Sequence, residues 1–182
     1  NANKHFYGHK ATYAGDERVD GNLVRDYNLV TEGGVFMGSG QSGLLIHEFL
    51  HTLGYQDSYV GAGGSMPVGR WDIMATETYH VQYPLAYFRS RYTKWFSISE
   101  VTTSQKGYGL YAASATTEAT KDRQAVILKT GYSDTEFFVL EYRKKGAAYG
   151  SEDYDVDIPG SGLIIYRVNT NAYRNYDGPP WQ

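Results

Sequence analysis

The sequence predicts an α+β protein with its helices in the first half and an all-β second half. Two observations support this fold class. An apolar run at residues 43–53 has the length and composition of a buried helix. From residue 98 onward, strand-like runs alternate with Gly, Ser and Asp turns. We therefore divide the 182 residues into a first domain at 1–97 and a β-rich second domain at 98–182.

The N-terminal part contains two strand-like runs, His5–Tyr13 and Leu23–Val30, joined by a polar turn. Residues 33–43 are dense in glycine but lack the Gly-Lys-Ser/Thr ending of a phosphate-binding loop. This segment is better explained as the entry to a helix, with Ser39 or Ser42 as the N-cap.

The helix predicted at 43–53 is apolar nearly all round, so we expect it to be buried. Its polar residues form one narrow stripe, His47, Glu48 and His51. Burying two imidazoles and a carboxylate is costly unless they are paired or bind a metal ion. This helix therefore combines the features of a core element with those of a binding site.

After this helix the sequence predicts a long irregular stretch at 58–83 and a second helix at 84–97. Pro84 suits the first helical position, and an apolar stripe along this helix is expected to face the core. Three basic residues then lie on its solvated face: Arg89, Arg91 and Lys94.

Four strands are predicted in the second domain, at 107–112, 124–130, 135–143 and 162–168. The alternation of side chains around Glu141 indicates that the third of them is half-exposed. Three acidic residues before the last strand, Asp153, Asp155 and Asp157, alternate with apolar ones. They form either a Ca²⁺ site or a solvated acidic loop, and they lack the glycine and terminal glutamate of an EF-hand.

Residues His47-Glu48-x-x-His51 carry the most specific pattern in the chain. Their spacing places two imidazoles on one helix face, one turn apart, where they can bind one divalent metal ion. The same spacing is found in zinc peptidases, where the glutamate is the general base. In a chain of this length and composition, about 0.007 occurrences of this pattern are expected by chance, so coincidence is a poor explanation.

Three further features lie downstream of the two histidines. Gly54 can adopt a positive φ, end the helix and turn the chain back. Asp57 then follows at a distance from which its carboxylate can return to the same metal. The segment Trp71-Asp72-Ile73-Met74-Ala75 is typical of a methionine-containing turn beneath such a site.

These motifs resemble the immune inhibitor A family of secreted bacterial metallopeptidases, which belong to the metzincin-like zinc peptidases. The similarity covers about residues 40–170 and is carried by the segments 47–57, 64–75, 136–143 and 159–168. The resemblance implies a metzincin-like catalytic core followed by a β-rich part, and a secreted, extracellular bacterial protein.

The resemblance also implies roles for individual residues. His47 and His51 would bind zinc, Glu48 would be the general base, and Met74 would form the hydrophobic floor. Asp57 stands where many metzincins have a third histidine, so we expect it to be the third ligand.

Three residues just past the methionine turn are further candidates. Glu77 and His80 compete with Asp57 as third ligand, and Tyr79 is a candidate for stabilising the transition state. Metzincin-type domains usually carry much of a mixed sheet before the active-site helix, whereas this chain has only 46 residues there. We therefore expect a core that is incomplete on its N-terminal side, and a piece whose activity depends on other segments of a longer parent chain.

The predicted function is that of a zinc-dependent endopeptidase, which hydrolyses peptide bonds of proteins with metal-activated water. The alternative is a non-catalytic extracellular binding or adhesion module with a relict or structural zinc site. A net charge of −3 argues against nucleic acid as a partner, and no apolar run is long enough to span a membrane. The absence of cysteine excludes disulfides and thiolate metal ligands.

Overall fold

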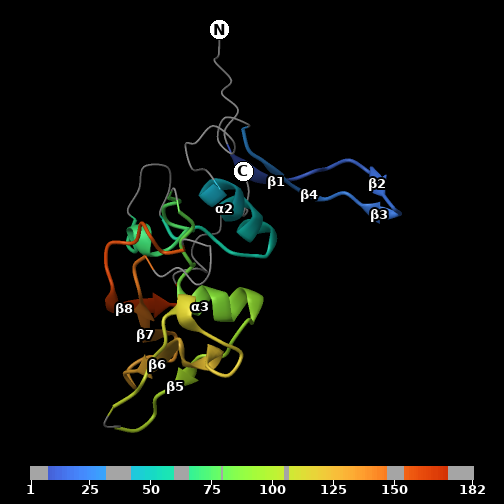
Figure 1. The fold of residues 1–182 in the computed structure, drawn as a ribbon. Coiled ribbons are helices and arrows are strands. Elements are labelled where there is room, and N and C mark those ends of the chain that lie inside the picture. The colour runs from blue at the N-terminus through green and yellow to red at the C-terminus, as the bar shows by residue number, and fades with distance from the viewer. Residues whose placement is uncertain are drawn as a thin grey trace. The chain divides into compact units, whose positions relative to one another are not determined.

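The structure, a computed structural model, describes residues 8–31, 42–59, 66–78, 80–104, 107–146 and 154–171. These parts are mixed α+β, with mostly strands and few helices (Figure 1). The chain divides into two compact units, residues 1–82 and 83–182, and each is described by itself. Within the described ranges, no helix is long and apolar enough to cross a bilayer.

The first unit begins with a two-stranded ribbon. Strand β1 (His9–Thr12) pairs antiparallel with β4 (Asp26–Leu29), and β2 (Arg18–Val19) pairs with β3 (Asn22–Leu23) farther along the same hairpin (Figure 1). The Asp-Gly pair between β2 and β3 has positive φ at both residues, as in the tight turns that match strand twist. Of the strand predicted at His5–Tyr13, residues 5–7 lie outside the described residues and β1 forms most of the remainder. The strand predicted at Leu23–Val30 is interrupted between β3 and β4.

Helix α2 (Ser42–Thr52) confirms the predicted apolar helix. It ends in a Schellman motif, in which the Tyr55 amide donates to the Leu50 carbonyl at 3.1 Å and the Gly54 amide donates to the His51 carbonyl at 3.0 Å. Gly54 has a φ of 94°, which an L side chain adopts only with strain. The turn predicted at Gly54 is therefore confirmed.

The two faces of α2 differ in exposure. His47, Glu48 and His51 are buried, whereas Leu45, Phe49 and Leu53 are 39%, 50% and 40% exposed. The expectation of a helix buried all round is wrong, because the described part of the first unit leaves this leucine and phenylalanine face open to solvent. The polar stripe, in contrast, lies on the buried side.

The second unit contains one four-stranded sheet, with β5 (Ser99–Glu100), β6 (Ala125–Lys129), β7 (Glu136–Arg143) and β8 (Gly162–Asn169) in this order (Figure 1). The β5–β6 pair is parallel and the other two pairs are antiparallel. Strands β6, β7 and β8 confirm three of the four predicted strands. Residues 107–112 form no strand.

The predicted second helix is shorter than expected. It consists of α3 (Ala86–Phe88) and a π-helical turn, η2 (Arg89–Thr93), and the chain leaves it at Lys94, which has a φ of 55°. The Ala86 amide donates to Glu141 Oε2 at 2.6 Å, so the first turn of this helix is bonded to the sheet. For this reason the helix belongs to the second unit, and the chain divides before it, whereas the sequence placed the boundary after residue 97.

Arg89 on this helix is buried, which corrects the expectation of a solvated side chain. Its Nε donates to the Pro84 carbonyl at 2.9 Å and its Nη1 donates to Gln124 Oε1 at 2.5 Å. Its guanidinium carbon also lies 5.4 Å from the centroid of the Tyr83 ring and 5.0 Å from that of Phe96. Hydrogen bonds and ring faces therefore replace water around this cation.

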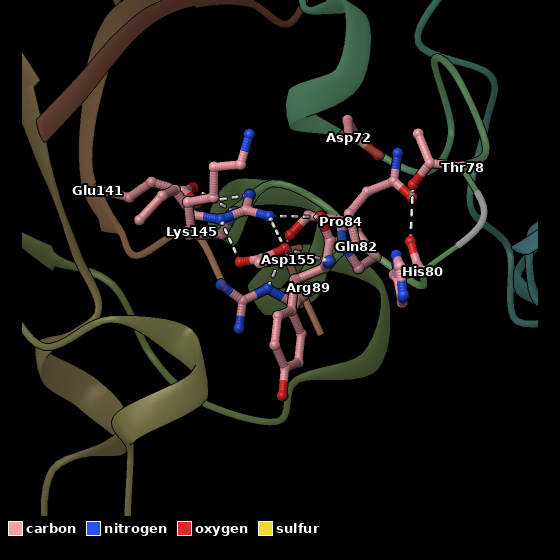
Figure 2. A network of polar contacts seen from close by, with 12 residues as sticks. Asp72, Thr78, His80, Gln82, Pro84, Arg89, Glu141, Lys145 and Asp155 are labelled. Atoms are coloured by element: carbon pink, nitrogen blue, oxygen red, sulfur yellow. Dashed lines mark hydrogen bonds and ion pairs between the residues drawn. The ribbon is translucent and has the colours of Figure 1, made fainter. Parts of the chain in front are cut away.

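Strand β7 carries a charged pair on its buried face. Arg143, which is fully buried, donates to Asp155 Oδ2 at 2.9 Å and Oδ1 at 2.5 Å, and to Glu141 Oε1 at 3.2 Å. Figure 2 shows Glu141 and Asp155 in this network, and the Tyr166 hydroxyl donates to the other oxygen of Glu141. Both carboxylate oxygens of Asp155, one of the three candidate Ca²⁺ ligands, thus accept hydrogen bonds from Arg143. Asp153 lies outside the described residues.

Candidate metal centre

Three side chains of the first unit converge on one point. Helix α2 presents His47 and His51 on its buried face, and the turn at Gly54 brings Asp57 back to them. Asp57 Oδ1 lies 3.2 Å from His47 Nε2 and 3.3 Å from His51 Nε2. One ligand atom from each of the three lies within 4.8 Å of the others, which is close enough for one metal ion to bind all three.

Backbone carbonyl groups fix the orientation of both imidazoles. His47 Nδ1 lies 2.8 Å from the Ile73 carbonyl oxygen, and His51 Nδ1 lies 2.8 Å from that of Tyr55. A carbonyl oxygen only accepts hydrogen bonds, so each Nδ1 carries the proton and, in the neutral ring, each Nε2 keeps its lone pair. Metal-binding histidines are oriented in this way by their second nitrogen.

Asp57 Oδ1 is buried, and no hydrogen-bond donor is assigned to it. Two imidazole lone pairs and a carboxylate oxygen therefore face one another, an arrangement that is repulsive unless a positive species lies between them. That species is either a proton on an imidazole or a metal cation. Two nitrogen ligands and one oxygen ligand in a buried site fit a zinc ion.

The ionisation of these groups reflects their mutual contacts. Burial raises the pKa of Asp57, but the two imidazoles, which donate to it and carry positive charge when protonated, outweigh burial and hold this pKa well below its usual range. Burial lowers the pKa of His47, but the Asp57 carboxylate and the Ile73 carbonyl outweigh it and raise this pKa above its ordinary value. The metal-free site thus favours a proton shared between imidazole and carboxylate, and a cation would replace this proton.

The methionine turn supports the site through its backbone. Asp72 is fully buried, and its Oδ1 accepts from the Met74 amide at 2.8 Å. The Met74 carbonyl in turn accepts from the amide of Ser58, the residue after Asp57, at 2.8 Å. Because the same turn supplies the Ile73 carbonyl to His47, it orients one ligand and holds the segment of another. Met74 itself is fully buried.

Glu48 is buried beside the three ligand residues but does not belong to their group. Its charge contributes to the raised pKa values of both His47 and Tyr59, which places its carboxylate close to the site. Glu48 thus adds a buried carboxylate beside this group of three side chains without belonging to it.

The other two candidate ligands are not members of this group. Glu77 is exposed, and among the described residues neither Glu77 nor His80 joins the two histidines. The Thr78 hydroxyl lies 2.6 Å from the His80 carbonyl (Figure 2) and 2.8 Å from Gln82 Oε1, so these contacts hold the segment after the turn. Tyr79 lies outside the described residues.

Gly43 allows the start of α2 to approach this segment. A Cβ atom at Gly43 would lie 2.6 Å from the Thr78 carbonyl oxygen, which is closer than real Cβ contacts. A larger residue here would push the helix away from residues 77 and 78. The absence of a side chain at Gly43 thus permits the close approach of helix α2 to the segment that follows the methionine turn.

Tyr59 is a site residue that the sequence did not single out. Burial raises its pKa to about 12, and the nearby Asp57 carboxylate adds to this effect. The available signal was its position two residues after Asp57, but 18 tyrosines in the chain obscure any single one. Tyr59 therefore lies near a ligand residue, as outer-shell groups of metal sites do.

Family models, curated proteins and solved structures were all compared with this chain, and none matches it.

Proposed function

We propose that this protein is a zinc-dependent endopeptidase with a metzincin-like core, similar to the secreted bacterial metallopeptidases of the immune inhibitor A family. The main support for this proposal is that His47 Nε2 and His51 Nε2 converge on the buried Asp57 Oδ1. Both Nδ1 atoms are hydrogen-bonded to backbone carbonyl groups. This arrangement directs both Nε2 atoms toward Asp57 Oδ1, as the binding of one metal ion by the three side chains requires.

The chain's own residues have distinct parts in the proposed reaction. His47, His51 and Asp57 would hold the zinc ion, which when bound polarises the scissile carbonyl and lowers the pKa of a water molecule. Glu48 would accept a proton from the attacking water molecule and pass it to the leaving amine. Asp57 adds negative charge that a third histidine would not, so more of the proton transfer depends on Glu48.

Zinc content and cleavage of a labelled protein such as casein test this proposal in the full-length protein. We expect one zinc ion per chain and cleavage that a chelator abolishes. Glu48→Gln should retain zinc and lose roughly 10²- to 10⁴-fold in activity, the usual contribution of a general base. Glu77→Gln, which changes an exposed carboxylate outside the ligand group, is the matched control and should behave like the wild type.

Two results would overturn the proposal. One is a Glu48→Gln protein that cleaves casein as fast as the wild type. The other is a wild-type protein that binds zinc tightly but cleaves no protein substrate, which would favour the non-catalytic module with a structural zinc.

A further inference from the structure

The second unit contains an open cavity of about 470 Å³, which lies within the size range of small-molecule sites. Its wall includes the aromatic side chains of Tyr83, Trp95, Phe96 and Tyr154 and a hydroxyl-bearing segment around Ser114. All of these residues belong to the second unit, and none takes part in the metal centre. The cavity is therefore a separate candidate site.

Ser114 gives the first indication of a ligand. It lies in the 3₁₀ turn η3 (Ala113–Ala115) and is 9% exposed, and its Oγ is buried with no hydrogen-bond partner. Buried hydroxyl groups are nearly always hydrogen-bonded, because leaving one unpaired costs free energy. Since Ser114 lines the cavity, a hydroxyl or carbonyl group of a ligand can supply the missing partner.

The aromatic residues supply ring faces next to this hydroxyl. Trp95 is 55% exposed, and the rings of Tyr83 and Tyr154 lie 5.3 Å apart at 42°. An exposed tryptophan beside a cavity offers a flat apolar surface on which a ring-shaped ligand can stack.

The charged groups of the cavity are engaged within the protein. Lys121 donates to Glu118, and Arg89 donates to Pro84 and Gln124 while it lies over two aromatic rings. A ligand therefore meets aromatic faces and a hydroxyl group more readily than an uncompensated charge. This favours a neutral ligand.

We propose that this cavity binds a neutral saccharide. The apolar C–H face of a pyranose ring stacks on Trp95, and one of its hydroxyl groups hydrogen-bonds to Ser114 Oγ. A sugar combines a flat apolar face with several hydroxyl groups, which is the combination that the cavity complements.

Titration of the full-length protein with cellobiose, maltose, chitobiose and galactose, followed by tryptophan fluorescence and saturation-transfer NMR, tests this proposal. We expect saturable binding of at least one of these sugars at millimolar or lower concentration, with sugar protons in contact with aromatic protons. Ser114→Ala and Trp95→Ala should each weaken binding by about tenfold or more, the effect of losing roughly 1.4 kcal/mol. Tyr132→Ala, at an exposed aromatic residue outside the cavity, should leave binding unchanged.

Circular dichroism of each variant shows whether it is folded, and Ser114→Ala removes only one oxygen atom, so it tests the site even if Trp95→Ala unfolds. The proposal is wrong if none of the four sugars binds, or if binding is the same in wild type and Ser114→Ala. Binding of glucose 6-phosphate or glucuronate, but of no neutral sugar, would also overturn it by showing that an anion is the ligand. Glu48→Gln should not affect sugar binding, which separates this result from that of the peptidase proposal.

Discussion

Replacing Asp57 by asparagine tests the metal centre most directly, because it removes one ligand charge and keeps the shape of the side chain. Asp57 Oδ1 is the point on which both imidazole nitrogens converge. Outer-shell changes alone weaken metal binding 10- to 100-fold, so a loss of about 100-fold is a conservative expectation for a ligand. At a zinc concentration of about 1,000 times the wild-type Kd, zinc adds about 4.1 kcal/mol to stability.

With a Kd raised about 100-fold, the Asp57→Asn protein at the same zinc concentration gains only about 1.4 kcal/mol, a difference of about 2.7 kcal/mol. For a unit of 60–100 residues this corresponds to a fall in the zinc-dependent increase of Tm by about 10 °C or more. Differential scanning calorimetry with and without zinc measures it, and Glu77→Gln is the control. A full zinc-dependent increase in the Asp57→Asn protein, or its loss in the control, would refute Asp57 as a ligand.

Four other outcomes follow from the contacts within the two units. Without metal, the contribution of His47 to stability is complete below the pKa of His47 in the unfolded state, and it is lost as pH rises through the raised pKa of the folded state. The contribution of Asp57 is lost as pH falls through the lowered pKa of Asp57 in the folded state. Zinc affinity should increase from about pH 5 to about pH 8, because zinc must displace the imidazole proton of the metal-free site. Calorimetric titration with zinc at several pH values measures this increase. Tyr59→Phe should weaken zinc binding about tenfold by removing the hydroxyl group near the Asp57 carboxylate, with Tyr132→Phe as control in a competition assay against a zinc chelator. Arg143→Met should cost about 3–5 kcal/mol in urea unfolding because it leaves two buried carboxylates unpaired, and Arg167→Met, in an exposed pair, less than about 1 kcal/mol.

Local sequence was sufficient for the part of the site that lies on one helix and its turn. The spacing of His47 and His51 depends only on helical geometry, and the helix ends where the Gly54 and Tyr55 amides donate to carbonyl groups of its last turn. These local features direct the chain back toward the histidines, and the Met74 carbonyl holds the segment of Asp57 through the Ser58 amide. The α+β fold class and three of the predicted strands follow similarly from local periodicity.

Contacts between distant residues explain what the sequence did not predict. Arg89 is buried because Gln124, on a different segment, accepts its hydrogen bond. The second helix is short because Lys94 adopts a left-handed conformation, although the apolar periodicity continues beyond it. Burial of Glu141 depends on Arg143, which in turn requires Asp155 from the loop before the last strand. None of these pairings has a signature in a single sequence.

The methionine turn shows how a correctly located motif can act through other atoms than expected. The resemblance implied that the Met74 side chain forms a hydrophobic floor, and Met74 is fully buried. The turn instead acts through its backbone, because the Ile73 carbonyl contacts His47 and the Met74 carbonyl contacts Ser58, the residue after Asp57. Asp72 holds the turn that aims both carbonyls. A backbone carbonyl does not depend on the identity of its own side chain. Asp72, whose side chain holds the turn, therefore matters to the orientation of His47 at least as directly as the Met74 side chain does.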